Sequence, residues 1–203
     1  MRFGRGPARL RAIMQQLNDT SSILALLATR KSASAKAMTA PGPTPEQLSE
    51  ILGLAVRVPD HGKLAPWRFI LWEGDARARF GDVMKVRWQA LHPDHGEGTL
   101  QFVHDLFLRA PTVLGVVSAA QEHPKIPLWE QQLSAGALCQ NILIASQALG
   151  WAGVWITEDA AFDSHVHAAL GLHGHEQVAG FIYLGTAKEK PAERQRPVVS
   201  TKA

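Results

Sequence analysis

The chain has 203 residues, of which 46% are hydrophobic and 19% are charged, a composition typical of a globular protein of about one domain. The formal net charge is only +3, and the 21 lysines and arginines are scattered, so the basic stripe of a nucleic-acid-binding protein is missing. The one cysteine, Cys139, excludes an intramolecular disulfide, and no apolar run approaches the roughly 18 residues of a membrane span. We therefore expect a cytoplasmic protein that has neither a nucleic-acid partner nor a membrane partner.

The N-terminal segment, residues 1–20, is basic and contains no acidic residue before Asp19. Its short apolar piece lacks the hydrophobic core of a signal peptide, so we interpret the segment as a flexible or loosely docked extension. We interpret the rest as one domain over residues 21–190 and a C-terminal tail over residues 191–203.

Helix signals dominate the first half of this domain. Thr44-Pro45-Glu46-Gln47 combines a hydroxyl N-cap, a proline at the first helical position and a glutamine three residues after the cap. This capping box predicts a helix that ends before Pro59. Residues 30–45 lack periodicity and are expected to form a loop. The other predicted elements are a helix over Ser22–Thr29, a strand over Phe69–Trp72, and helices over Ala76–Ala90 and Leu100–Arg109.

The second half alternates buried strands with helices. Residues 129–149 predict a long helix, rich in small residues and apolar on most faces, which we place in the centre of the fold or in a subunit interface. Strands are predicted over residues 111–119, 151–157 and 178–186, and a helix over residues 162–170. Because helices and strands mix without a regular βαβ rhythm, we expect an α+β fold in which helices cover a small sheet.

A cluster of cations and hydroxyls follows the first helix, in the sequence Arg30-Lys31-Ser32-Ala33-Ser34. Phosphate binds to such a mixture, because Arg offers charge-assisted hydrogen bonds, Ser offers hydroxyl donors and a loop leaves backbone N–H groups free. The alternative is a solvated basic turn, since short runs of basic and hydroxyl residues are common.

The turn from Arg57 to Trp67, RVPDHGKLAPW, holds more ionisable residues than a connector needs. One interpretation is that Arg57, His61 and Lys63 contact a ligand. The other is that Asp60 and His61 terminate the preceding helix, with His61 near its negative end.

Other familiar sites are not indicated. The nine histidines include no pair four residues apart and no cysteine-rich set, so we expect no metal site. Ser134 lies outside a G-x-S-x-G motif, and the sequence contains neither G-x-G-x-x-G nor a P-loop. A serine hydrolase, a Rossmann NAD site and an NTPase therefore have no support.

Five segments form an ordered set: LLATRKSAS, AVRVPDHGKLAPWRFILWEG, KIPLWEQQLSAG, ALGWAGVWIT and GFIYLGT. Each is modest alone, but together they run from about Ser22 to Thr186. The set resembles the nitroreductase family of FMN-dependent oxidoreductases, and its small bacterial members of the YdjA type in particular. The resemblance implies an α+β sandwich whose mostly antiparallel sheet is covered by helices, in an intertwined homodimer with two FMN sites at the subunit interface.

The resemblance also implies which residues form the sites. The basic loop would meet the FMN phosphate and ribityl chain, the charged turn would reach the FMN of the partner subunit, and the strand over residues 151–157 would line the flavin. A further segment would bind the nicotinamide nucleotide, and no catalytic residue is assigned. The implied cofactor residues are Arg30, Lys31, Ser32, Ser34, Arg57, His61, Trp155, Ile156 and Thr157, and the implied nucleotide residues are Ala145, Ser146, Gln147, Ala148, Leu149 and Gly150.

Two positions depart from the family pattern. Ile156 stands where close relatives have an arginine, which removes a cation near the cofactor, and Ala35 stands at a usually basic position, next to Lys36. The implied function is electron transfer from NADH or NADPH, through FMN, to an electron-poor acceptor such as a nitro compound or a quinone. Ile156 leaves an alternative open, an FMN-storage or FMN-sensing protein without efficient turnover.

Overall fold

The computed structural model describes residues 16–197, and within them five strands form one sheet. β5 (Gln177–Ala187) pairs with β3 (Thr112–Ser118), with β4 (Ala152–Ile156) and, at its last residues, with the two-residue β1 (Met38–Thr39). β2 (Trp67–Glu73) pairs along its whole length with β3. Every one of these pairs is antiparallel, as predicted.

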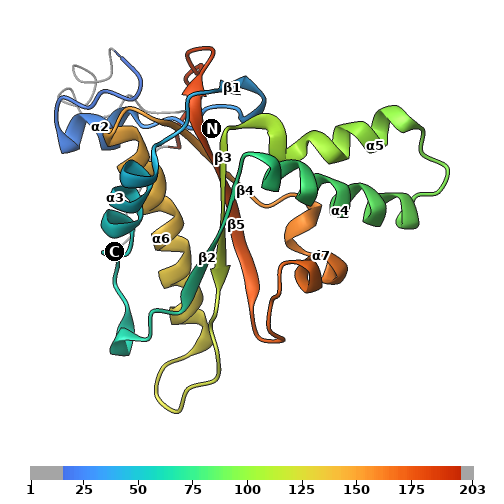
Figure 1. The fold of residues 1–203 in the computed structure, drawn as a ribbon. Helices are drawn as coiled ribbons and strands as arrows, with labels where there is room; N and C mark the ends of the chain where they lie inside the picture. The colour runs from blue at the N-terminus through green and yellow to red at the C-terminus, as the bar shows by residue number, and fades with distance from the viewer. Residues whose placement is uncertain (1–15, 198–203) are drawn as a thin grey trace.

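Helices lie on both sides of this sheet (Figure 1). α3 (Pro45–Ala55) and α6 (Leu128–Ala148) lie on one side, with α2 (Ile23–Thr29) beside one end of α6. The other side holds α4 (Asp75–Leu91), α5 (Glu97–His104) and the short α7 (Ser164–Ala169). The α+β sandwich is thereby confirmed, whereas the intertwined homodimer, which one chain cannot display, stays a prediction.

Two hydrophobic clusters fill the spaces between the sheet and its helices. On the α6 side, aliphatic side chains such as Ile51, Leu138 and Ile142 pack with no exposed surface. On the α4 side the cluster is aromatic, with the rings of Phe107 and Phe181 5.1 Å apart. Because α6 supplies a large part of the first cluster, it lies in the centre of the fold, one of the two places predicted for it.

The capping box predicted before α3 is present. Thr44 Oγ1 accepts a hydrogen bond from the Gln47 amide at 3.3 Å, and the Gln47 side chain accepts one from the Thr44 amide at 3.0 Å. These bonds satisfy two backbone donors that the start of a helix leaves free. The helix ends at Ala55, before Pro59, as expected.

Two element predictions were wrong. The loop predicted over residues 30–45 contains a 3₁₀ turn, η1 (Ala35–Ala37), and β1, which forms because its residues pair with the end of β5, a partner that local periodicity does not reveal. The helix predicted over Leu100–Arg109 begins earlier, as α5, and continues as a 3₁₀ helix, η3 (Asp105–Arg109). At Asp105 the backbone N–H is shared between the carbonyls of Gln101 and Val103, which tightens the helix end.

Most of the predicted N-terminal extension lies outside the described residues. Of its last part, Asn18 and Asp19 are docked on the start of the domain: Asn18 Oδ1 accepts from the Lys31 amide (2.7 Å), and the Asp19 amide donates to Thr29 Oγ1 (2.9 Å). Within residues 16–197, no helix is both long enough and apolar enough to cross a membrane.

Candidate functional site

The loop that follows α2 is fixed by hydrogen bonds of its backbone. The Lys31 carbonyl accepts a bond from Gln147 Nε2 (2.9 Å), and the Lys31 amide is held by Asn18 as described above. The Ala33 amide donates to the Gly153 carbonyl at 3.1 Å. The loop is therefore held between the last turn of α6 and the start of β4, while the side chains of Arg30, Lys31 and Ser32 remain partly exposed.

Cations from distant parts of the chain meet at this loop. Arg196 Nη2 donates to the Arg30 carbonyl (3.4 Å), and Arg30 Nη1 donates to Ser32 Oγ (3.2 Å). Partial burial lowers the pKa of the Arg30 guanidinium, and the positive charges of Arg196 and Arg194 lower it further. Glu193 offsets part of this charge through a 3.0 Å ion pair with Arg196. Such a group of mutually repelling cations favours the binding of an anion.

Sequence reasoning missed Arg194 and Arg196. Both lie in the tail, far along the chain from Arg30, and the only available signal was the basic character of that tail. Their approach to the loop is a tertiary contact that no local pattern predicts.

In the turn after α3, Asp60 has a structural role. Its carboxylate accepts hydrogen bonds from the amides of Leu64 (3.2 Å) and Ala65 (2.8 Å). These bonds hold a turn in which Gly62, Lys63 and Ala65 have φ angles of 73°, 56° and 45°. Non-glycine residues adopt such angles only where their surroundings impose them. Asp60 therefore organises the turn. The interpretation that it terminates the preceding helix was wrong, because α3 ends at Ala55 with Val56 as its C-cap and the Asp60 carboxylate bonds only to later residues.

The remaining ionisable side chains of this turn are exposed. His61 Nδ1 lies 2.7 Å from Glu130 Oε2, and Arg57 is fixed through its carbonyl, which accepts a 3.2 Å bond from Asn141 Nδ2. The side chains of Arg57, His61 and Lys63 all face solvent. They are therefore accessible to a second molecule.

The basic loop and the His61 turn lie at opposite ends of α6 (Figure 1). Glu130, the partner of His61, is in the first turn of this 21-residue helix, and Gln147, the partner of Lys31, is in its last turn. At about 1.5 Å per residue, roughly 25 Å separates these contacts along the helix. One chain does not bring Lys31 and His61 together.

The implied flavin-lining residues of β4 face opposite sides of the sheet. Trp155 packs with the α6-side cluster, donates from Nε1 to the Ala179 carbonyl (3.0 Å) and lies against Gly180, where an added Cβ would overlap the indole. Ile156 packs with the α4-side cluster, as the alternation of a strand requires. Their two side chains do not line the same surface. The end of β4 can instead offer its backbone and the partly exposed Thr157.

Half of the implied nucleotide segment is buried inside the chain. Ala145, Ser146 and Gln147 are at most 6% exposed, and Ser146 Oγ donates to the Ile142 carbonyl at 2.7 Å. Gln147 holds the basic loop, so its role in this chain is structural. The exposed residues of the segment are Ala148 and Gly150, with Leu149 partly exposed.

An ion pair that sequence reasoning did not find lies next to the end of β4. Arg109 Nη2 donates to both carboxylate oxygens of Glu158, at 2.7 and 2.8 Å, and to Tyr183 Oη at 3.2 Å. Burial acts to lower the pKa of the Arg109 guanidinium, but the hydrogen bond to Glu158 and the neighbouring Tyr183 raise it overall. Burial also raises the pKa of the Tyr183 phenol. The pair is therefore a charged contact against a neutral ring.

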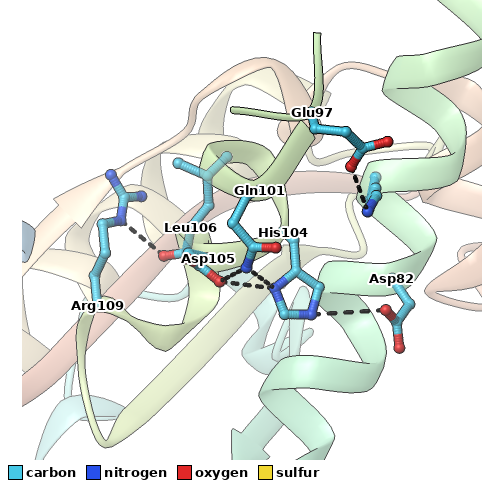
Figure 2. A network of polar contacts seen from close by, with 8 residues as sticks. Asp82, Glu97, Gln101, His104, Asp105, Leu106 and Arg109 are labelled. Atoms are coloured by element: carbon cyan, nitrogen blue, oxygen red, sulfur yellow. Dashed lines mark hydrogen bonds and ion pairs between the residues drawn. The ribbon is translucent and has the colours of Figure 1, made fainter. Parts of the chain in front are cut away.

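The α4–α5 hairpin beside this pair is stiffened by polar contacts (Figure 2). His104 Nδ1 lies 2.7 Å from Asp105 Oδ1, and its Nε2 lies 3.6 Å from Asp82 Oδ1 across the two helices. Gly81 permits this close approach, because a Cβ there would overlap the His104 carbonyl.

A mainly apolar cavity of about 520 Å³ lies between this hairpin and the segment from Glu158 to Val166. No residue implied to bind cofactor or nucleotide lines it, so we place the candidate site by its polar chemistry. Within residues 16–197, no three His, Cys, Asp or Glu side chains are grouped as a metal site requires.

Comparisons with known sequences agree over most of the chain. The model of the nitroreductase family matches residues 27–186. A Haemophilus influenzae protein named "Putative NAD(P)H nitroreductase" is 39% identical over 180 residues, which cover 88% of this chain and 95% of that protein. "Putative NAD(P)H nitroreductase YdjA" of Escherichia coli K12 is 36% identical over 167 residues, covering 82% of this chain and 89% of that protein.

Solved structures share the fold. The nitroreductase-like family protein from Bacillus cereus matches with a TM-score of 0.75 at 20% identity, covering 88% of this chain and 92% of that one. A mutant of the FMN- and NADPH-dependent nitroreductase NfnB from Sphigopyxis sp. strain HMH matches with a TM-score of 0.63 at 21% identity, covering 85% of this chain and 93% of that one. The structural likeness supports the α+β fold, and the family match with the identity of the two relatives establishes kinship: the chain belongs to the nitroreductase family.

Proposed function

We propose that the protein is an FMN-dependent oxidoreductase that uses NADH or NADPH to reduce an electron-poor acceptor, such as a nitro compound or a quinone. Family membership and the names of the relatives support this activity. The observation on which the proposal chiefly depends is the group of cations around Arg30, which matches the charge of a flavin phosphate.

The donors around Arg30 fit the phosphate of FMN. Arg30 and Arg196 bring guanidinium groups, and Ser32 Oγ already lies within 3.2 Å of Arg30 Nη1. A phosphate dianion placed here would accept charge-assisted hydrogen bonds and relieve the repulsion from Arg196 and Arg194, which together with burial lowers the pKa of Arg30. Lys31 and Ser34 flank the same loop and are further candidates.

The anchoring of the loop supports a flavin ring that lies near β4. Because the Ala33 amide is bonded to Gly153, the phosphate site directly adjoins this strand. The end of β4, at Ile156 and Thr157, would then meet the ring, mainly through its backbone. Trp155 would not contact the ring but would support the strand from the α6 side.

A complete site would need a second chain. Arg57 and His61 are exposed, and the His61 contact with α6 lies roughly 25 Å from the Lys31 contact with the same helix. Large apolar side chains are exposed on α2 and α6, among them Ile23 (82%) and Trp129 (67%), which is unusual unless another surface covers them. We propose a homodimer in which His61 and Arg57 of one subunit complete the FMN site of the other.

When bound, FMN would accept a hydride from the nicotinamide and pass the electrons to the acceptor. The task of the chain is to bind and orient the cofactor. The cations around Arg30 would hold the phosphate, and the end of β4 would orient the ring edge through its backbone. No side chain in the candidate site is required as an acid or a base.

Ile156 favours a second candidate, an FMN-storage or FMN-sensing protein, because an isoleucine gives no positive charge at a position where close relatives have an arginine. Anaerobic mixing of the FMN-loaded protein with NADH and with NADPH separates the two functions. Fast loss of the flavin absorbance, restored by a nitroaromatic or a quinone, is expected. Full FMN occupancy without bleaching by either nucleotide would contradict the oxidoreductase and support the storage protein. Ile156→Arg is the matched variant. If the wild type proves to be a storage protein, this variant should gain flavin reduction by NADH or NADPH.

A further inference from the structure

The residue that follows the proposed flavin-lining strand has an unusual backbone. Glu158 has φ 53° and ψ −179°, a region that is essentially restricted to glycine. It directly follows Thr157 and starts the 3₁₀ turn η4 (Asp159–Ala161), whose Ala161 amide donates to the Glu158 carbonyl at 3.2 Å. A non-glycine residue keeps such a conformation only where its side chain or its neighbours hold it in place.

The Glu158 side chain is held by Arg109. Both carboxylate oxygens accept from the same Nη2, at 2.7 and 2.8 Å, and the two side chains are 28% and 13% exposed. Arg109 is itself fixed, because its Nε donates to the Leu106 carbonyl at 2.7 Å (Figure 2). Its guanidinium carbon lies 5.0 Å from the ring centre of Tyr183, a fully buried residue of β5. A partly buried pair with one fixed partner is far more rigid than a surface salt bridge.

The pair connects three elements at one point. Arg109 belongs to η3, Glu158 lies two residues after β4, and Tyr183 of β5 pairs with Val154 of β4 in the sheet. Rotation about φ of Glu158 turns the peptide unit between Thr157 and Glu158. Anchoring the side chain therefore sets the direction of the Thr157 carbonyl and of the Glu158 amide.

We propose that Arg109 and Glu158 are positioning residues, whose ion pair fixes the peptide unit after Thr157 in the orientation in which it meets the flavin ring. This inference depends on the proposed function, since it assumes that the end of β4 lines FMN. A peptide dipole fixed against the ring affects both the affinity for FMN and the flavin reduction potential.

The decisive variant is Glu158→Gly. Glycine adopts the observed backbone angles without strain, and this relief offsets part of the stability that is lost when Arg109 loses its partner. Glu158→Gln keeps the size and one acceptor, and Arg109→Lys keeps the charge but loses the planar fork. Asp159→Asn, a change at the adjacent exposed carboxylate, is the matched control.

Three quantities are measured on the same purified, FMN-loaded samples: the FMN dissociation constant, the flavin midpoint potential and the melting temperature. For Glu158→Gly we expect FMN binding weakened by about tenfold or more and a displaced potential, at a melting temperature no lower than that of Glu158→Gln. Glu158→Gln should recover part of the affinity, and Asp159→Asn all of it. A tenfold loss would correspond to about 1.4 kcal/mol.

Wild-type affinity and potential in Glu158→Gly would overturn the inference, and so would losses in all variants that simply follow their melting temperatures. Failure of the wild-type protein to bind FMN would remove the proposed function, and the inference with it. Unchanged variants of an FMN-binding wild type would remove the inference alone.

Discussion

Replacing Gly180 by alanine tests whether the Trp155 indole supports β4. In the folded chain an alanine Cβ at this position would overlap the indole, which packs against Gly180 and donates to the Ala179 carbonyl at 3.0 Å. The other end of the indole faces α6, where a Cβ built on Gly136 would lie 3.9 Å from Trp155 Cη2. The substitution must therefore displace Trp155.

The cost has two parts. Forcing a side chain out of a packed position costs about 1–3 kcal/mol, and loss of the indole hydrogen bond adds about 1 kcal/mol. The sum is about 2–4 kcal/mol, which for a chain of this size corresponds to a fall of about 5–15 °C in melting temperature.

Thermal unfolding followed by circular dichroism measures this change. Gly53→Ala is the matched control, because a Cβ at this exposed α3 position meets nothing within 4 Å. There alanine is the better helix former and should stabilise by about 0.5–1 kcal/mol. A Gly180→Ala protein with the same melting temperature as the wild type would refute the packing described for Trp155.

Further predictions concern one buried acid and two cations. Arg68, at 2.7 Å, is the main cause that lowers the pKa of Glu176 from 4.5 to about 2, so the pair stabilises the fold above pH 4.5 and this stability is lost as the pH falls towards 2. Chemical unfolding at pH 6 and at pH 3 should show a loss of about 2 kcal/mol in the free energy of unfolding that is absent in Glu176→Gln, and an equal loss in both proteins would refute it. Arg196→Ala should weaken FMN binding by about tenfold with little change in melting temperature, as measured by flavin fluorescence, and an unchanged affinity would exclude Arg196 from the phosphate site. Arg57→Ala should lower FMN occupancy of the purified protein, and full occupancy would show that Arg57 does not reach the cofactor of the partner subunit.

Local signals in the sequence predicted those elements whose cause is local. The capping box at Thr44 and the long run of small and apolar residues over 129–149 each indicate a helix through neighbouring residues, and both helices are present. β1 depends on a partner at the other end of the chain, and the end of α5 depends on a shared backbone bond. Local periodicity in the sequence therefore predicts neither feature.

In the candidate site too, residues with local signals can be predicted, and residues brought together by the fold cannot. Residue types indicate the basic loop, whereas the family resemblance implies nucleotide binding for its anchor Gln147, because burial is not visible in a motif. Arg196 and the pair of Arg109 with Glu158 come from segments that meet only in the folded chain. The opposite facing of Trp155 and Ile156 could have been predicted from the strand period of two.

The visible spectrum of the freshly purified protein, together with that of the supernatant released by heat, tests the central claim most directly. The account predicts a yellow protein that releases FMN in an amount equal to the amount of chain, and that elutes as a dimer. A colourless protein that stays colourless after incubation with FMN, or a monomer that keeps its FMN, would contradict a flavin site built from two chains.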